Sequence, residues 1–266
     1  MINRRQKSTK RLEQFIDKAE AIREDHPEIG CRKMALILKQ PGLGRDKIES
    51  FLLKAGFRII YPPNYMKTTH RVQFRQFRNL IEGLSINGIN KVIQTDITYL
   101  WVKDRFYYLV FIIDVYSRMI VGYHASLGMK AQANLEALRM MIRKRGKENI
   151  EGVIHHSDRG SQYHCTEYLK ELKDHKIQIS MCDQAWENAY TERINRTIKN
   201  EYLRHRQIGC LNTVRRELKK AINLYNTRRP HWSLVGQMPP EEFEEYVKKL
   251  SKGKKPQMTI YKSDEL

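Results

Sequence analysis

The order of strand-like and helix-like segments between residues 89 and 203 is the strongest constraint on the fold. Three runs rich in β-branched and aromatic residues predict an antiparallel meander, and they span residues 92–102, 105–115 and 118–126. A helical pattern follows, and then strand, helix and strand patterns alternate, at 131–145, 151–156, 164–175 and 177–181. Strands that alternate with helices need crossover connections, so the sequence predicts an α/β layer fold with a mixed sheet.

Three acidic residues stand at prominent points of this pattern. Asp96 lies in the middle of the first strand, where a charge has to be compensated. Asp158 ends the strand in the stretch GVIHHSDRGSQY, and Gly160 after it permits a tight turn at the carboxyl edge of the strand. Glu192 lies in a helical stretch, residues 186–203, that contains no Gly or Pro. Asp-x-Gly is also ordinary turn chemistry, so the second of these signals is weak when taken alone.

Carboxylates from two strands and a helix can converge on divalent cations. Oxygen ligands of this kind hold Mg²⁺ or Mn²⁺, and two such ions can clamp the attacking and leaving oxygens of a phosphoryl transfer. Other side chains nearby have simpler interpretations. Asp114 precedes a turn, where we expect an ion pair or a turn hydrogen bond, and we interpret His155 and His156 as structural histidines rather than zinc ligands.

The charge of the chain indicates a polyanionic partner. With 49 basic and 30 acidic side chains among 266 residues, the net charge is +19, and it is spread over both halves.

The four cysteines follow no metal-binding spacing and no secretory signal precedes them, so we expect reduced thiols in the cytoplasm. No apolar run reaches transmembrane length.

The N-terminal region has the grammar of a helix-turn-helix unit. Helical patterns at 8–25, 31–39 and 46–55 are joined by short turns that contain Gly. A plain three-helix support bundle is the alternative interpretation. Arg45 and Lys47 favour contact with phosphates, although they identify no base sequence.

The segments that flank the sheet are less regular. Residues 61–88 form a basic linker, which either tracks a DNA backbone or is a solvated tether, and Phe74, Phe77, Leu80 and Ile81 indicate that its later part docks as a short helix. A helix after Asn212 ends at YNTRRPHWSL, where we expect Arg228 and Arg229 to contact DNA and Trp232 to pack. A short helix at 240–250 and a loose Lys-rich tail complete the chain.

Five motifs in order give a family resemblance: TDITY, FIIDVYSR, HSDRGSQY, NAYTERINRTIKNE and YNTRRPHWSL. Together they resemble the catalytic domain of the insertion-sequence-three family of bacterial transposases, in its second-reading-frame product. The resemblance implies a ribonuclease-H-like integrase core at 89–240, with a mixed five-stranded sheet flanked by helices. A small all-α helix-turn-helix-like domain at 1–60 would precede it, and a helix and tail at 241–266 would follow.

The resemblance also implies a function and partners. Asp96, Asp158 and Glu192 would be the Asp-Asp-Glu triad that binds two Mg²⁺ or Mn²⁺ ions and catalyses DNA strand cleavage and strand transfer. Expected partners are the element ends and target DNA, further copies of the chain on DNA, and a first-reading-frame protein, in the cytoplasm at the bacterial nucleoid. A nuclease that only hydrolyses, or an inactive DNA-binding protein, are the alternatives.

One spacing departs from the family pattern. The family usually places 35 residues between its second Asp and its Glu, whereas 33 residues separate Asp158 from Glu192. Glu187 and Asp183 therefore stay as alternatives for the third ligand. Family members often carry Lys or Arg seven residues after the Glu, and Lys199 stands there, nearly two helical turns on and on the same face. We expect further DNA contacts from two more arginines, Arg159 and Arg196.

Overall fold

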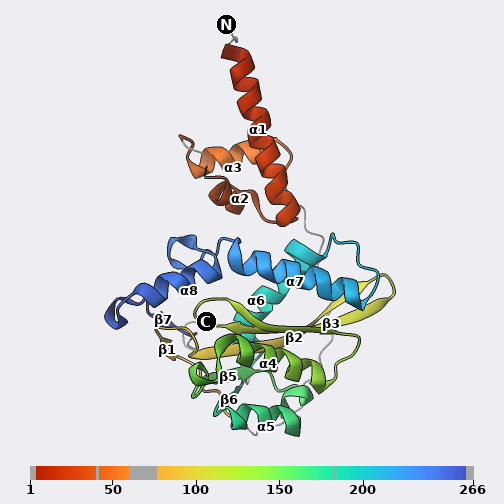
Figure 1. The fold of residues 1–266 in the computed structure, drawn as a ribbon, viewed down its shortest axis with the longest axis vertical. Helices are drawn as coiled ribbons and strands as arrows, with labels where there is room; N and C mark the ends of the chain where they lie inside the picture. The colour runs from red at the N-terminus through yellow and green to blue at the C-terminus, as the bar shows by residue number, and fades with distance from the viewer. Residues whose placement is uncertain (1–3, 40–41, 60–76, 183, 262–266) are drawn as a thin grey trace.

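A mixed five-stranded sheet forms the centre of the computed structural model, which describes residues 4–39, 42–59, 77–182 and 184–261 (Figure 1). The strands lie in the order β4-β3-β2-β5-β6. Their bounds are β2 Val92–Val102, β3 Arg105–Asp114, β4 Ile120–Ser126, β5 Ile154–Ser157 and β6 Gln178–Met181. The meander β2-β3-β4 is antiparallel, and β5 and β6 run parallel to β2. The predicted α/β fold with a mixed five-stranded sheet flanked by helices is confirmed.

Helices cover both faces of the sheet, and this explains the nearly continuous apolar run of β3. Leu109, Phe111 and Ile113 face one core, which they share with the helices α6 Ala189–Thr197 and α7 Leu211–Thr227. The alternate residues of β3 face a second core, formed with α4 Ala131–Arg145 and α5 Thr166–Asp174. Successive side chains of a strand point to opposite faces, so a strand buried on both faces needs apolar residues throughout.

Two details set how the helices pack. At Gly122 in β4 an added Cβ would come within 2.3 Å of the carbonyl oxygen of Ala137, so glycine is required where β4 meets α4. Helix α6 continues directly into a π-helical segment, η4 Ile198–Leu203, which the sequence pattern did not predict. The remaining short segments are 3₁₀ turns: η1 Lys147–Asn149, η2 Ser161–His164, η3 Ala185–Asn188, η5 Val235–Gln237 and η6 Lys252–Lys254.

The N-terminal helices have a small core of their own. They are α1 Arg4–Asp25, α2 Cys31–Leu38 and α3 Arg45–Lys54, close to the predicted ranges. Phe15, Met34 and Leu52 are among the buried side chains that hold them together. The three helices lie beside α7 at one end of the molecule, with α5 at the opposite end (Figure 1).

The turn between α1 and α2 attaches this unit to the π-helical segment. His26 Nδ1 lies 2.8 Å from the hydroxyl of Tyr202, and both side chains are buried. The backbone N–H of Glu28 donates to the carbonyl oxygen of Glu201 at 3.0 Å. Because burial dominates, the pKa of His26 is lowered to about 4, and the imidazole is neutral at physiological pH.

Both flanking segments differ from their predictions. Residues 77–84 contain no helix, although Ile81 is fully buried, and Phe74 lies outside the described residues. The chain then forms β1 Ser85–Ile86, which pairs with β7 Met258–Thr259 near the other end of the sequence. The prediction of a loose tail is therefore wrong for residues 251–261, because Ile260 is buried beyond α8 Pro240–Lys249.

Of the helices that the structure describes, none combines the length and the apolar character needed to cross a bilayer.

Candidate active site

The sheet brings Asp96 and Asp158 to neighbouring positions. In the parallel pairing of β2 with β5, Gln94 lies opposite His156. Two residues further along each strand are Asp96 and Asp158, so the register sets the two carboxylates side by side at the carboxyl edge of β5. Both side chains are half-buried.

Glu192 approaches the same edge from the first turn of α6, which packs against β2. The side chain of Glu192 is exposed. Its charge nevertheless reaches the strand pair, because the pKa of Asp96 is raised well above its ordinary value by burial, then by the charge of Asp158, and also by that of Glu192. The sheet and α6 thus gather negative charge around Asp96.

Asp158 is held by the turn that follows it. The backbone N–H of Gly160 donates to Asp158 Oδ1 at 3.0 Å. Burial raises the pKa of Asp158, and this hydrogen bond opposes the rise. An added Cβ at Gly160 would lie 3.0 Å from Asp158 Oδ1, so a larger residue there would crowd the carboxylate.

Asn195 of α6 contacts Asp96, and Lys199 of the π-helical segment lies close enough for its charge to act on it. Asn195 Nδ2 donates to Asp96 Oδ2 at 2.7 Å, and Asn195 Oδ1 is buried with no hydrogen-bond partner among the described residues. Lys199 Nζ donates to the carbonyl oxygen of Tyr99 at 3.4 Å. Burial lowers the pKa of Lys199, and the charge of Asp96 opposes this. The sequence analysis missed Asn195, although its position three residues after Glu192 places it on the same helical face.

The structure gives Glu187 a different role from metal binding. Its side chain is 4% exposed, and its carboxylate accepts the backbone N–H of Gln184 at 3.2 Å in a capping box at the start of η3. Its carbonyl oxygen accepts the side-chain amide of Gln94 at 3.0 Å, which ties this turn to β2. These contacts favour Glu192 over Glu187 as the third carboxylate. The other alternative, Asp183, lies outside the described residues.

Asp114 forms the turn hydrogen bonds and the ion pair that its position before a turn predicts, and His155 takes part in a buried hydrogen bond. Asp114 is fully buried, accepts the backbone N–H groups of Tyr116 and Ser117 at 3.0 Å, and pairs with Arg145 at 3.3 Å. His155 Nε2 lies 2.8 Å from the hydroxyl of Tyr168, and burial lowers the pKa of this histidine to about 4.

His156 is similarly placed. Its Nδ1 lies 2.8 Å from Ser180 Oγ, and burial lowers its pKa to about 3. In each histidine the second ring nitrogen is buried without a hydrogen-bond partner among the described residues. Both rings are therefore neutral structural groups. Within the described ranges, no three His, Cys, Asp or Glu side chains already stand as a cluster that could hold a metal ion.

The expected DNA-contacting arginines fall into different environments. Arg229 is 5% exposed, and it donates to both carboxylate oxygens of Glu201, at 2.8 and 2.7 Å. This buried ion pair engages the guanidinium of Arg229, and the expected contact of Arg229 with DNA stays a prediction. Arg228, by contrast, is exposed and pairs with Asp25. Trp232 was expected to pack, but its ring is 38% exposed.

The other candidates for DNA contact lie on the surface or at its edge. Arg159 is half-buried and donates to the carbonyl oxygen of Cys182 at 2.9 Å. Arg196 and Lys47 are exposed, and Arg45 pairs with its neighbour Asp46 at 3.0 Å.

Comparisons with known proteins agree with this geometry. Two family models, both described as integrase core domain, match residues 87–185 and 173–240. The transposase InsF for insertion sequence IS3A of Escherichia coli is 33% identical over 170 residues, which cover 62% of this chain and 58% of that protein. An uncharacterised 31 kDa protein of insertion element IS600 from Shigella sonnei is 28% identical over 224 residues, 81% of each chain.

Solved structures give a weaker likeness. The catalytic core domain of HTLV-2 integrase, in complex with magnesium, is 18% identical with a TM-score of 0.46, and the match covers 63% of this chain and 99% of that one. The chain matches 58% of the length of the InsF transposase, which is less than two thirds of that protein. The two core-domain matches together span residues 87–240, so the chain carries an integrase core domain, and it is similar to proteins of insertion sequences.

Proposed function

We propose that this chain is a DNA transposase that cleaves strands at the ends of an insertion sequence and joins them to target DNA. The observation that carries the proposal is the position of Asp96 beside Asp158, with the charge of Glu192 reaching Asp96 from α6. This arrangement lies in an integrase core domain whose relatives include an insertion-sequence transposase.

The donor set fits divalent cations. Asp96, Asp158 and Glu192 offer only carboxylate oxygens, which suit Mg²⁺ or Mn²⁺. Burial and mutual repulsion raise the pKa of Asp96, so a cation there would relieve an electrostatic cost that the protein itself leaves in place. We propose that these three residues hold two such ions, which would supply charge stabilisation and an activated oxygen nucleophile when bound.

The neighbouring side chains position the reacting groups. Asn195 and the backbone of Gly160 fix the orientations of the Asp96 and Asp158 carboxylates. Lys199, whose charge lies near Asp96, would hold a non-bridging oxygen of the scissile phosphate. Such positioning contributes to the rate because the attacking oxygen and the phosphorus must be aligned before the reaction.

The chemistry has two steps of one kind. In the first, a water oxygen attacks the phosphorus at the end of the element, the bond from phosphorus to the 3′ oxygen breaks, and that oxygen takes up a proton. In the second, the freed 3′-hydroxyl loses its proton as its oxygen attacks a phosphorus of the target. The target's own 3′ oxygen leaves.

The wider organisation belongs to the same proposal. We assign DNA binding to a helix-turn-helix-like unit at 1–60, connection to the linker at 61–88, catalysis to 89–240 and support to 241–266. The chain would act as a homo-oligomer on element ends and target DNA in the bacterial cytoplasm, at the nucleoid. A first-reading-frame protein would add end recognition.

A strand-transfer assay tests the function. The full chain, an end duplex, a supercoiled plasmid and Mg²⁺ should give joined products, which require both steps. Asp158→Asn removes a charge and keeps the shape of the side chain, so it should abolish joining while DNA affinity stays. If the duplex is hydrolysed and no joined product forms, the chain is a nuclease that only hydrolyses DNA. If neither product forms, the chain is an inactive DNA-binding protein.

A further inference from the structure

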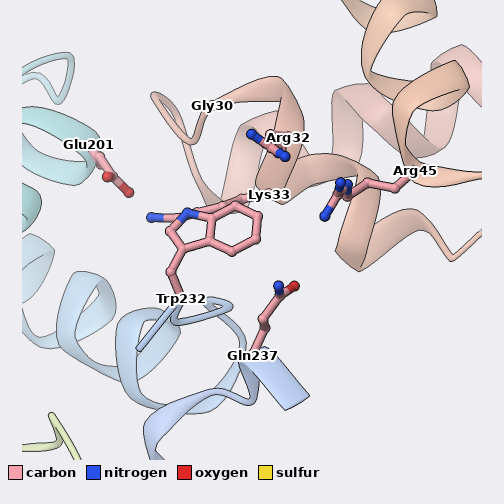
Figure 2. A pocket seen from close by; sticks show the side chains of 7 residues that line it. All are labelled: Gly30, Arg32, Lys33, Arg45, Glu201, Trp232 and Gln237. Carbon is pink, nitrogen blue, oxygen red and sulfur yellow. The ribbon is translucent and has the colours of Figure 1, made fainter. Parts of the chain in front are cut away.

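A surface hollow of about 660 Å³ lies where the N-terminal helices meet the core (Figure 2). We name it the junction hollow, and its lining residues are Gly30, Arg32, Lys33, Arg45, Glu201, Trp232 and Gln237. They come from the turn before α2, from α2 and α3, from the π-helical segment, and from the loop after α7 and the 3₁₀ turn η5 that follows it. None of the three proposed catalytic carboxylates lines it, so the junction hollow is a separate place on the molecule.

Positive charge dominates the junction hollow. Arg32, Lys33 and Arg45 extend toward the space around Trp232 (Figure 2). The acidic lining residue, Glu201, already has both carboxylate oxygens bound by Arg229 behind it.

The cations of the lining are weakly neutralised. Arg32 reaches Glu49 only at 3.9 Å, and the 3.0 Å pair of Arg45 with Asp46 is exposed, so both stay accessible to an anion. Burial, and then the nearby charge of Arg229, lower the pKa of Lys33 to about 8. An anion in the junction hollow would favour its charged form.

Trp232 gives the junction hollow a flat aromatic surface. The guanidinium carbon of Arg32 lies 5.7 Å from the centre of the indole ring, which is 38% exposed. The loop that carries the ring is fixed, because Leu234 is buried and the N–H of His231 donates to the carbonyl oxygen of Gln237 at 3.2 Å. A large exposed ring on an anchored loop, surrounded by cations, has the composition of a platform for a nucleic acid base.

We propose that the junction hollow binds a single-stranded stretch of DNA, with its phosphates against Arg32, Lys33 and Arg45 and one base stacked on Trp232. The choice of DNA rests on the proposed function, whereas the site itself does not depend on the three carboxylates. Stacking and phosphate contact make separable contributions, because a stacked base adds affinity without neutralising charge.

Binding of a fluorescein-labelled oligothymidylate to the full chain tests the proposal, measured by anisotropy over a range of salt concentrations. EDTA removes divalent ions, so the assay measures binding without strand transfer. Failure of this proposal can therefore be distinguished from failure of the proposed strand-transfer activity, which is measured separately with Mg²⁺. Trp232→Ala should weaken binding by about 5- to 150-fold with an unchanged salt slope. The double variant Arg32→Ala, Lys33→Ala should lower the slope by about 1.4, since each phosphate on a single strand contributes about 0.7.

Two matched controls and a changed ligand complete the design. Trp101 is 52% exposed on the β2-β3 hairpin, and Lys173 is exposed on α5 at the opposite end, so Trp101→Ala and Lys173→Ala should bind like the parent chain. An abasic strand should bind the parent and Trp232→Ala equally, because it has no base to stack.

The proposal is overturned if Trp232→Ala weakens binding by less than about fivefold relative to Trp101→Ala, because a stacked base should contribute at least that much. Equal weakening on abasic and normal strands would overturn it as well. If Trp232→Ala does not keep the parental melting temperature, Trp232→Leu replaces it under the same criteria, since leucine keeps apolar volume and removes the aromatic face.

Discussion

The neighbours Arg228 and Arg229 should differ sharply in what they contribute to stability. Arg229 is 5% exposed and makes two hydrogen bonds to Glu201, at 2.8 and 2.7 Å. Burial alone would lower the pKa of Arg229, and the bonds to Glu201 overcome that effect and raise it. Arg228 is 62% exposed in its pair with Asp25, so water competes for its charge.

The expected magnitudes follow from this difference in burial. Removing one partner of a buried ion pair leaves the other charge uncompensated and costs about 3–5 kcal/mol. For a chain of this size, Arg229→Met should therefore lower the melting temperature by about 6–20 °C. Arg228→Met breaks an exposed pair, which contributes about 0–1 kcal/mol.

Thermal and urea unfolding of the two variants measure the difference directly. The substitution is the same at adjacent positions, so the pair controls for the lost charge and for the general effect of methionine. The reasoning is refuted if Arg229→Met unfolds within about 1 kcal/mol of Arg228→Met, the whole range of an exposed pair. That result would return Arg229 to the residues available for DNA.

Four further predictions concern the candidate active site. Glu192→Gln should abolish strand transfer and Glu187→Gln should retain it; the opposite result in the joining assay would exchange their roles. Asn195→Ala should slow joining by about 10- to 100-fold, as when a residue that orients a metal ligand is lost, and Asn195→Asp should not restore it, because a carboxylate cannot donate to Asp96. Burial and the charge of Asp158 raise the pKa of Asp96, so the folded chain holds that proton more tightly than the unfolded chain. Metal-free stability should thus decline as pH rises from about 4, the ordinary Asp value, through the raised pKa, and Asp96→Asn should reduce this decline in melting scans, with the pKa of Asp158, which burial also raises, accounting for part of the remainder. Lys199→Ala should reduce joining more than DNA affinity in parallel assays, and equal losses would make Lys199 a general phosphate contact.

The sheet could be predicted from the sequence because burial on both of its faces imposes long apolar runs. Strand β2 and helix α4 have the predicted bounds, Val92–Val102 and Ala131–Arg145. The positions of Asp96 and Asp158 could be inferred as well, since a carboxylate in or directly after such a strand is conspicuous. The pairing of β2 with β5, which sets these two carboxylates side by side, could be seen only in the structure.

Features that depend on distant contacts could not be predicted. Strands β1 and β7 are far apart in the sequence, and each contributes only two residues to their pair. Such short strands leave no periodic pattern in the sequence. Residues 77–84 dock by single contacts, such as that of the Leu80 N–H with Ser180 Oγ at 2.9 Å, and need no helix. Arg229 is buried against Glu201, which lies 28 residues earlier in the sequence, whereas its neighbour Arg228 is exposed.

The attachment of the N-terminal helices bears on how this protein can be recombined with its relatives. The carbonyl oxygen of Glu201 at the end of the π-helical segment is satisfied by the N–H of Glu28, and the hydroxyl of Tyr202 by His26. A chimera that exchanges residues 1–60 for those of another protein would expose both groups unless the incoming turn reproduces these two donors or acceptors. A graft that replaces the three N-terminal helices therefore has to keep or rebuild the α1-α2 turn as well as the core that the helices share.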